Sequence, residues 1–530
     1  MARQEGRNGM NGDELAVGTM GAKAQSVPDE VEVAVVGAGP AGLTIASLLA
    51  AYGVKTVVFD RAAGPARYSR AAVVHARTLE TLEPLGVVDE MLSKGVVVPH
   101  FSVRDRDRRL LAVHFGELST PYPYTLMLPQ DETEHLLRGA LHDQGGEILW
   151  EHEVTDVRQY TSEVGLTVRS LQGDRQVRAR YVVGCDGMHS SVREAVDIPF
   201  EGETYPQSFV LADVRMDWGL PNNEVQLFFS PDGLVVVAPL PHGRHRIVAT
   251  LDEAPPEPTL DDVQALLDAR GPRAPQSRIE EVIWSSRFRV SRKLAVRFHE
   301  GRVFLCGDAA HVHSPAGGQG MNTGIQDAAN LAWKLALVLR GCASESLLDS
   351  YERERRQVAQ DVVSMTDRLT RLATVHSPIA RRLRNALIAV VGRVGRVPRR
   401  LATNLAELDI AYRNGWSLDD STTVERWAPK GDGLFPSLDP NLRLVVPEAQ
   451  QPLAIADSAR FPNVPVRVVS RPGVDRAVIV RPDGYVAGGS TTSAHAKLLD
   501  LLVRALGDKC GESRASVLPD RLSKQRAKVR

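Results

Sequence analysis

The sequence predicts a mixed α/β protein in which a Rossmann-like domain is interrupted by an antiparallel-sheet domain and followed by a smaller α/β domain. Three observations favour this fold class. A strand, a glycine-rich turn and a helix follow one another over residues 31–52. Many short strand-like runs separated by Pro and Gly occupy residues 206–296, and the pattern changes again after residue 430. With 530 residues the chain has room for about three domains.

Composition limits the classes of partner. The formal net charge is −1 and the sequence pI is near 6.9, so the whole-chain charge gives no indication of a nucleic-acid or anionic-membrane partner. No apolar run is long enough for a membrane helix. The four cysteines are scattered without a C-x-x-C pair, which favours a reducing cytoplasm over a disulfide or zinc framework. Residues 1–28 are polar and Gly-rich, and we expect a disordered tail there.

The first structured segment carries a dinucleotide-binding fingerprint. Residues 31–36 form an apolar run that leads into Gly37, Gly39 and Gly42, and Asp60 follows 21 positions after Gly39 at the end of a second run. Gly37 permits the turn, Gly39 lets the backbone approach a pyrophosphate, and Gly42 lets helix and strand pack closely. Asp60 favours FAD or NAD over NADP, because a carboxylate repels a 2′-phosphate; otherwise it is a solvated acid at a strand end.

A later strand, loop and helix repeat this kind of arrangement. The run 302–306 is followed by Gly307 and Asp308, then by a glycine-rich loop and a helix expected from about Met321 to Arg340. A carboxylate at the end of a strand can accept hydrogen bonds from sugar-alcohol hydroxyls, although a helix N-cap is the alternative role for Asp308. The glycines permit close backbone approach to a flat ring, or they simply form turns.

Three motifs in series resemble the FAD-dependent aromatic hydroxylases, the class A flavoprotein monooxygenases. They are Gly37-Ala-Gly39-Pro-Ala-Gly42, Gly184-Cys-Asp186-Gly187 with Ser190 and Arg193, and the segment from Gly307-Asp308 to Gly320-Met-Asn322. The resemblance implies a discontinuous FAD-binding domain (29–205 and 297–405), an inserted antiparallel-sheet substrate domain (206–296), and a linker with a thioredoxin-like C-terminal domain (406–530). The C-terminal segment resembles that of the subgroup containing phenol and pentachlorophenol hydroxylases and aromatic polyketide hydroxylases.

The same resemblance assigns the cofactor site. Asp308 is expected to hold the FAD ribityl chain, and Asp186 and Gly187 to lie where FAD and a nicotinamide cofactor both approach. Arg70 is expected near the flavin ring as the catalytic residue, and Arg61 on the adenosine side; a surface role is the alternative for both arginines. The remaining predicted cofactor contacts are Ala41, Gln130, Val154, Pro315, Gly318, Gly320, Met321 and Asn322.

The implied function is hydroxylation of an aromatic, phenolic or polyketide-type polycyclic substrate with NAD(P)H and O₂, through a flavin C4a-hydroperoxide. Only one glycine fingerprint is present, so NADPH or NADH is expected as a transient visitor beside non-covalently bound FAD. Baeyer–Villiger oxidation, epoxidation, antibiotic inactivation and non-catalytic FAD or drug binding remain alternatives. We expect a monomer or homodimer with no nucleic-acid or membrane partner.

Two further expectations concern side chains. His75, His311 and His313 are expected to make structural hydrogen bonds and not to bind a metal, since no third ligand lies near them in sequence. Apolar residues of the 206–296 sheet, such as Phe228 and Val236, are expected to line the substrate pocket. The sequence leaves open the substrate, the choice between NADH and NADPH, and the role of the C-terminal domain.

Overall fold

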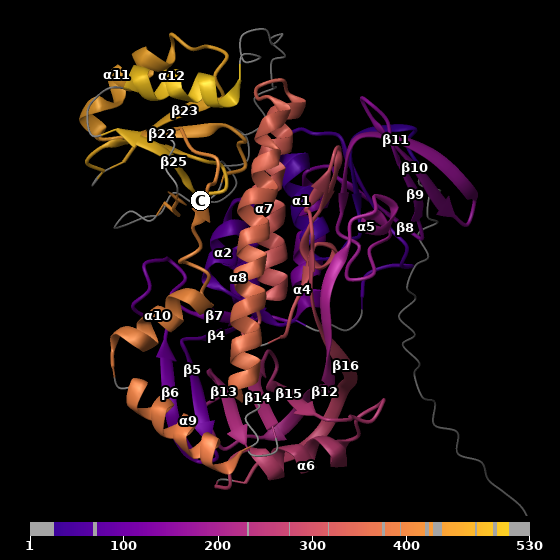
Figure 1. Cartoon of the computed structure of the whole chain (residues 1–530), viewed down its shortest axis with the longest axis vertical. Coiled ribbons are helices and arrows are strands. Elements are labelled where there is room, and N and C mark those ends of the chain that lie inside the picture. The colour runs from indigo at the N-terminus through magenta and orange to yellow at the C-terminus, as the bar shows by residue number, and fades with distance from the viewer. Residues whose placement is uncertain are drawn as a thin grey trace, which may run out of the picture.

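The computed structural model describes residues 26–66, 71–230, 233–274, 276–315, 317–373, 377–392, 394–418, 423–427, 437–471, 474–490 and 495–507. Two sheets lie at different levels of the long axis, and a small α/β unit lies at the end opposite the second sheet (Figure 1). The predicted tail at 1–28 lies outside the described residues up to residue 25, and Val27 packs against the core. Arg70, the predicted catalytic residue, also lies outside them.

The first sheet has a parallel centre. Its strands run in the order β18 (Val303–Leu305), β11 (Gly173–Gly184), β1 (Glu30–Val36), β2 (Thr56–Asp60) and β8 (Glu147–Trp150). The edge strand β17 (His299–Glu300) and the hairpin partners β9 (Glu153–Gln159) and β10 (Val164–Ser170) are antiparallel. From Val33 to Val36, β1 is buried on both faces, as its run of apolar residues predicts.

Three helices cover this sheet around α1 (Pro40–Ala51). The side chains from Gly42 to Leu49 are all buried, because α1 packs against both α4 (Gln130–Asp143) and α7 (Gly320–Leu339). The expected helices at 131–143 and about 321–340 are therefore confirmed. α7 is long, but no helix among the described residues is both long and apolar enough to cross a membrane. The short elements nearby are α2 (Ala76–Leu82), α3 (Val88–Lys94), α5 (Ser191–Ala195), and the sheet of β3 (Val73–Val74), β7 (Thr125–Met127) and β4 (Val96–Val98).

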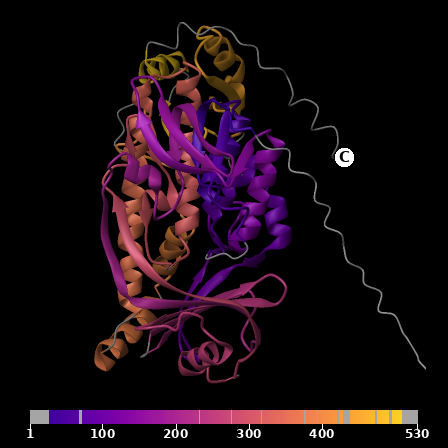
Figure 2. The same cartoon turned by 90° about the vertical axis from the view of Figure 1, so that its right-hand side faces the viewer.

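The second sheet is mostly antiparallel and has eight strands. Its order is β19 (His311–Val312), β16 (Arg278–Ala295), β12 (Phe200–Asp217), β15 (Arg244–Leu251), β14 (Gly233–Leu240), β13 (Glu224–Ser230), β5 (His100–Asp105) and β6 (Arg108–His114). The hairpin at 100–114 thus joins this sheet through a parallel pairing of β5 with β13, although the sequence analysis grouped it with residues 29–205. One face packs on α6 (Leu260–Arg270), as the side view in Figure 2 shows.

Three helices return from the first sheet to the second. α8 (Asp349–Ala373) runs beside α7 in the long direction of the molecule, and α9 (Pro378–Val391) and α10 (Arg396–Leu405) then pack against β6 (Figure 1). This agrees with the Arg-rich helical stretch expected at 350–403. α9 and α10 therefore cover the edge strand β6 of the second sheet.

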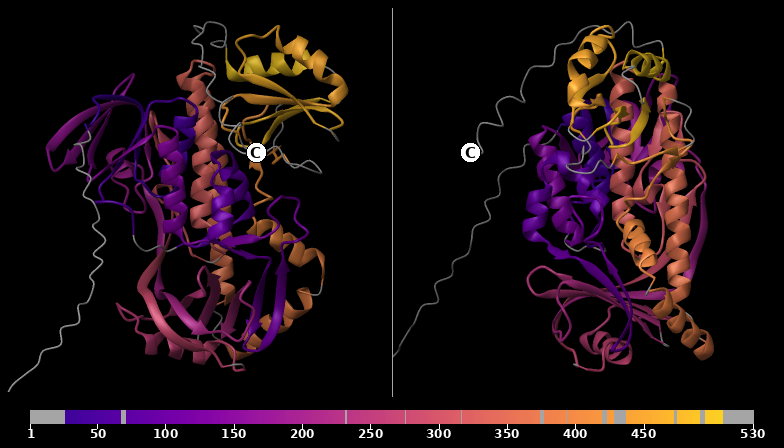
Figure 3. Two further views of the ribbon diagram at one scale, coloured as in Figure 1. Left: turned by 180° about the vertical axis from the view of Figure 1, so that it is seen from behind. Right: turned by 90° about the vertical axis from the view of Figure 1, so that its left-hand side faces the viewer.

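The C-terminal unit is a four-stranded sheet with two helices on it. Chain order is β22 (Leu442–Val446), α11 (Gln451–Ser458), β23 (Val466–Ser470), β24 (Ala477–Val480), β25 (Val486–Ser490) and α12 (His495–Leu506), and sheet order is β23-β22-β24-β25. β22 and β23 are parallel, whereas β24 is antiparallel to both of its neighbours. The rear view in Figure 3 places this unit beside the upper ends of α7 and α8.

A buried ionic network joins this unit to the helices. Arg481 donates to both carboxylate oxygens of Glu354 at 2.7 and 2.9 Å, and Lys334 donates to the same carboxylate at 2.8 Å. All three side chains are fully buried. The positive neighbours outweigh the effect of burial and hold the pKa of Glu354 well below its usual value. A second link runs from Arg426 to Glu80 at 2.7 Å. Arg426 follows closely after β21 (Thr423–Val424), which pairs antiparallel with β20 (Tyr412–Arg413).

Candidate active site

The glycine turn between β1 and α1 has three distinct environments. Gly37 has φ +103°, and a Cβ there would lie 2.4 Å from the Cys185 carbonyl oxygen. A Cβ on Gly42 would lie 1.9 Å from the Gly37 oxygen, whereas a Cβ on Gly39 would meet no protein atom within 4 Å. Gly39 therefore borders open space at the N-terminus of α1, whose first turn carries no acidic residue. An anion such as a pyrophosphate fits this position.

Asp60 is bound to this turn. Its carboxylate accepts one backbone N–H from Ala38 at 2.7 Å and one from Ala62 at 2.8 Å. A carboxylate has about four acceptor positions, so two such bonds leave capacity for ribose hydroxyls. Asp60 is thus more than a solvated acid at a strand end, because it also fixes the geometry of the glycine turn.

A small pocket of about 70 Å³ opens beside Asp60. Five predicted cofactor residues line it: Gly37, Asp60, Arg61, Val154 and Asp186. The pocket also takes in four residues that the sequence analysis did not identify, namely His152, Glu153, His189 and Ser191. One oxygen of Asp186 accepts from Ser191 and from the Val192 N–H, and its other oxygen is buried without a hydrogen-bond partner among the described residues. A polar ligand in this pocket would satisfy that oxygen.

The loop containing Asp186 and Gly187 is tied to the next motif. Gly187 has φ +81° with no atom within 4 Å of a built Cβ. Ser190 caps α5 by accepting the Arg193 N–H, and the Arg193 guanidinium donates at 3.0 Å to the carbonyls of Met188 and Ala309. Arg193 thereby holds the second motif against the turn that carries Asp308.

The turn at 307–311 presents one carboxylate outward. Asp308 is exposed between the buried residues Gly307 and Ala309. It lies inside a short 3₁₀ turn whose N-cap is Cys306, so the helix-cap alternative for Asp308 does not hold. A Cβ on Gly307 would lie 3.2 Å from the Ala41 Cβ and 3.6 Å from the Gly324 Cα, which brings α1, this turn and α7 together.

Asp327 fixes this turn from α7, and sequence reasoning did not identify it. Its carboxylate accepts from the Gly307 N–H at 3.2 Å, from His311 Nε2 at 2.7 Å and from Arg355 Nε at 2.6 Å. Burial alone would raise the pKa of Asp327, but the Arg355 and His311 charges outweigh it and lower the pKa. Two features of the sequence could have indicated this pair. Asp327 is an acid within an otherwise apolar helix, and Arg355 lies in the Arg-rich helical stretch that follows.

Hydrogen bonds from Asn322 and His75 hold the glycine loop that precedes α7. The Asn322 side chain donates to the carbonyls of Val73 and Gly318 at 2.8 and 2.7 Å and accepts the His75 N–H at 2.9 Å. His75 Nε2 lies 2.8 Å from the Gly317 carbonyl, to which it donates. Burial lowers the pKa of His75 to about 4, so this imidazole is neutral near pH 7. The expected structural roles of His75 and His311 are confirmed by these contacts.

The other predicted residues of this half lie around the same loop. Gly320 and Met321 begin α7, whose first turn contains no acidic residue, and Pro315 is exposed at the start of the loop. Gln130 begins α4, where its N–H donates to Ala71 at 3.0 Å and its side chain donates to Glu134 at 2.8 Å. The described residues contain no group of three or more His, Cys, Asp or Glu side chains that could hold a metal ion.

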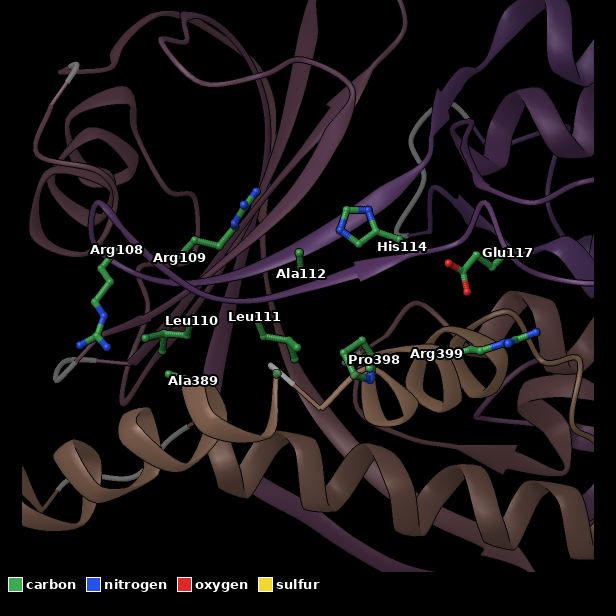
Figure 4. Close-up of a pocket in the computed structure, with 12 residues that line it drawn as sticks. Arg108, Arg109, Leu110, Leu111, Ala112, His114, Glu117, Ala389, Pro398 and Arg399 are labelled. Atoms are coloured by element: carbon green, nitrogen blue, oxygen red, sulfur yellow. The ribbon is translucent and has the colours of Figure 1, made fainter.

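A larger cavity of about 470 Å³ lies between β6 and the helices α9 and α10. Figure 4 shows Leu110 and Leu111 facing the helices that carry Ala389 and Pro398, with Arg108 and Arg399 at the rim. α10 also reaches the glycine loop, because Gln319 donates to the Leu405 carbonyl at 3.3 Å. The expectation that Phe228 lines a substrate pocket was wrong, since Phe228 is fully buried in the cluster beneath α6. Val236 lies in a cluster with Ile388 of α9.

The geometry fits an FAD. The open N-terminus of α1 with Asp60 beside it, the turn that carries Asp308, and helix α7 lie on elements that meet where Gly307 approaches Ala41 and Gly324. A protein family described as "FAD binding domain" matches residues 30–366. The chain belongs to this family and is an FAD-dependent monooxygenase of the aromatic hydroxylase class.

Similar proteins give more particular parallels. The 6-methylpretetramide 4-monooxygenase of Streptomyces rimosus is 34% identical, with 93% of this chain and 98% of that protein covered. The pentachlorophenol 4-monooxygenase of Sphingobium chlorophenolicum is 32% identical over 66% of both chains. The solved anhydrotetracycline hydroxylase of Streptomyces rimosus has a TM-score of 0.75 at 32% identity, covering 89% of this chain and 98% of that one.

Proposed function

We propose that this enzyme uses NAD(P)H and O₂ to hydroxylate a polycyclic, phenolic substrate of the aromatic polyketide type, as in antibiotic biosynthesis. The observation that carries the proposal is the cavity of about 470 Å³ between β6, α9 and α10. One of its walls is α10, whose last residue, Leu405, accepts a hydrogen bond from Gln319 beside the glycine loop. Its volume lies within the range of roughly 300–1,000 Å³ found for small-molecule sites. The names of the relatives acting on tetracycline precursors support a polycyclic substrate.

Different residues of the chain bind different parts of FAD. Gly39 and the N-terminus of α1 hold the pyrophosphate, Asp60 accepts from the ribose, and Arg61 and Val154 line the adenosine side. Asp186, which lines the same small pocket, is proposed to lie where FAD and the nicotinamide cofactor both approach. Asp308 and Gln130 hold the sugar-alcohol chain. The bound FAD supplies hydride acceptance from NAD(P)H and oxygen transfer to the aromatic ring.

The start of α7 stabilises negative charge. Its first N–H groups, from Gly320 to Asn322, would hold the flavin ring of a bound FAD, and no acid in the first turn offsets the helix dipole. Reduced flavin is an anion, so this helix end favours the reduced state. Arg70 lies close in sequence to Val73 and His75, and its proposed role is to orient substrate or the reduced ring.

The substrate site combines an apolar floor with cationic groups. Leu110, Leu111 and Pro398 offer apolar contact to fused rings, and Arg108 and Arg399 offer charge to phenolate oxygens. Such a site binds an electron-rich ring and excludes water from it.

The proposed domain division follows the resemblance. Residues 29–205 and 297–405 form the FAD-binding domain, except that the 100–114 hairpin goes with the substrate domain at 206–296. The C-terminal unit is proposed to be thioredoxin-like, supported by its βαβ–ββα order and the sheet order β23-β22-β24-β25. The sequence contains no C-x-x-C motif for thioredoxin-like redox work, so its proposed role is packing or dimer contact. The cytoplasm is the proposed compartment.

The test is oxygen incorporation by purified FAD-loaded enzyme. A panel of polycyclic phenols is incubated with NADH or NADPH under ¹⁸O₂, and products are analysed by mass spectrometry and NMR. We expect one substrate class to stimulate NAD(P)H oxidation and to gain a single labelled hydroxyl on a ring. A labelled lactone or epoxide would instead assign Baeyer–Villiger or epoxidising chemistry. FAD binding without substrate-stimulated NAD(P)H oxidation across the panel would favour a non-catalytic binding protein.

A further inference from the structure

Helix α9 has its apolar side turned away from the protein. Ile379, Leu383, Leu387 and Val390 are 80%, 70%, 61% and 60% exposed, and their spacing places them on one side of the helix. Val394 and Val397 continue this stripe into the start of α10. These six residues are half of the twelve large apolar side chains that are strongly exposed in the described part of the chain. We call these six side chains the outward stripe.

Contacts on the opposite side of α9 fix this orientation. Arg384 and Asn385 are buried, and Asn385 donates to Asp105 of β5 at 2.7 Å. The Arg384 guanidinium lies 4.9 Å from the centre of the Phe229 ring and donates to the Leu372 carbonyl at 2.9 Å. α9 therefore turns Arg384 and Asn385 inward and its leucines outward, although Ile388 also packs inward. An ordinary surface helix buries its apolar stripe.

The segment around α9 and α10 carries a strong excess of positive charge. Residues 368–406 contain nine arginines and no Lys, Asp or Glu, although the whole chain has a net charge of −1. They are Arg368, Arg371, Arg381, Arg382, Arg384, Arg393, Arg396, Arg399 and Arg400. Arg382, Arg396 and Arg400 are exposed in the same segment as the outward stripe, whereas the exposed Arg399 lines the large cavity. The surface that covers the stripe must therefore be both apolar and anionic.

We propose that α9 and the start of α10 form an interfacial element that docks the enzyme on an anionic lipid bilayer. Aliphatic residues on one side of a helix with arginines along its borders are typical of helices that lie in the plane of a membrane surface. The apolar side chains enter the acyl boundary while the arginines reach the phosphate groups. Docking of this kind needs no spanning helix. This proposal differs from our expectation of no membrane partner, because that expectation used the net charge of the whole chain and not the charge of this segment.

A second copy of the chain fits the segment less well. Two-fold pairing of α9 with itself would bring arginines against arginines, and residues 368–406 offer no acid to neutralise them. The stripe also has no Trp, Tyr or Phe, the residues that dominate the centre of protein interfaces. A lipid surface supplies fluid apolar contact and many negative charges without shape complementarity.

The inner side of the same segment lines the large cavity. Ala389, Gly392, Gly395, Pro398 and Arg399 line this cavity. Figure 4 shows Ala389 and Pro398 across from Leu110 and Leu111 of β6. A docked enzyme would hold this cavity beside the bilayer, where a lipophilic compound partitions. The docking surface itself follows from the outward stripe and its arginines, and it does not depend on the proposed reaction.

The experiment is flotation of FAD-loaded enzyme with vesicles of phosphatidylcholine alone or mixed with phosphatidylglycerol. We expect binding to the mixed vesicles that weakens with added salt, and little binding to phosphatidylcholine alone. Leu383→Gln with Leu387→Gln should weaken binding about tenfold or more, because both side chains lose apolar contact with the bilayer. Arg382→Gln with Arg396→Gln should weaken it to a similar extent, about fivefold for each charge lost.

Matched controls use exposed apolar residues elsewhere. Leu171 is 87% exposed at the β10–β11 hairpin and Leu453 is 61% exposed on α11, so Leu171→Gln with Leu453→Gln removes similar surface at distant places. This control should float like the unchanged enzyme, and all variants should keep their FAD content and melting temperature. Absence of binding to mixed vesicles, or equal loss in the control, would overturn the proposal. A dimer in sedimentation analysis that dissociates on Leu383→Gln with Leu387→Gln would also overturn it, because a second copy would then cover the stripe.

Discussion

Replacing Gly39 or Gly42 by alanine should separate binding of the cofactor from stability of the fold. Both glycines belong to the turn between β1 and α1, yet a Cβ on Gly39 meets no protein atom within 4 Å and a Cβ on Gly42 lies 1.9 Å from the Gly37 oxygen. Gly39 has φ −77° and ψ −178°, a conformation that alanine adopts without strain. The two substitutions add the same methyl group in two different environments.

The magnitudes differ accordingly. Gly39→Ala should leave the apoprotein as stable as before, or more stable by about 0.4–1 kcal/mol, because alanine reduces the entropy of the unfolded chain. Its methyl group would occupy the space where the pyrophosphate approaches, so FAD affinity should fall about 100-fold, equivalent to about 2.7 kcal/mol. Gly42→Ala must displace the turn, which costs about 1–3 kcal/mol or more in the apoprotein.

The assay compares three apoproteins prepared by removing FAD. Gly116→Ala is the control, because a Cβ on Gly116 also meets nothing within 4 Å but lies far from the turn in sequence. Thermal unfolding reports the stability of each apoprotein, and quenching of flavin fluorescence reports FAD binding. Normal FAD affinity in Gly39→Ala would refute the assignment of the pyrophosphate to this turn. Loss of apoprotein stability in Gly39→Ala would refute the claim that its surroundings are open.

Four further outcomes are expected. Asp308→Ala should weaken FAD retention by about 1–3 kcal/mol without unfolding the chain, as measured by flavin release during dialysis; unchanged occupancy would remove Asp308 from the site. Arg70→Ala should lower hydroxylation about 10- to 1000-fold while FAD stays bound, and near-normal turnover would assign Arg70 to the surface. Arg355→Leu should destabilise the apoprotein by about 3–5 kcal/mol in thermal unfolding, because it leaves Asp327 without its buried guanidinium partner; a change below about 1 kcal/mol would contradict this. Burial raises the pKa of Glu407 to about 8, above its usual 4.5, so the stability from the neutral carboxyl is complete below pH 4.5 and is lost as pH rises through 8. Glu407→Gln should therefore lessen the fall in unfolding free energy between those values by up to about 1.4 kcal/mol per pH unit, and an unchanged pH profile would show that Glu407 is ionised throughout.

Local patterns in the sequence were enough to predict the cofactor half of the fold. The apolar run ending at Val36 and the spacing from Gly39 to Asp60 are short-range signals, and the structure has the strand, turn and helix they predict. The hydrogen bonds from Asn322 to Gly318 and from Val192 to Asp186 also lie within or near the motifs that indicated these residues. Elements and site contacts that involve residues close together in the sequence could therefore be predicted from it.

Contacts between distant segments were not readable in this way. β5 pairs with β13 across more than one hundred residues, and nothing in the 100–114 run specifies that partner. Side chains alternate between the two faces of the strand that contains Phe228. This alternation does not say which face of the sheet packs on α6 and which packs on α9. Asp327 and Arg355 lie on different helices, so their pairing became visible only in three dimensions.

The buried contact between Arg481 and Glu354 has a consequence for how the protein is made. The two residues are 127 positions apart, and Glu354 precedes Arg355, which holds Asp327 and the turn bearing Asp308. At about 5–20 residues per second, a ribosome needs roughly 6–25 seconds to reach Arg481 after adding Glu354. During that interval, Glu354 and Lys334 lack the guanidinium that completes their network. The FAD site should therefore reach its final form only after Arg481 has been synthesised, so cofactor loading would follow the synthesis of the C-terminal unit.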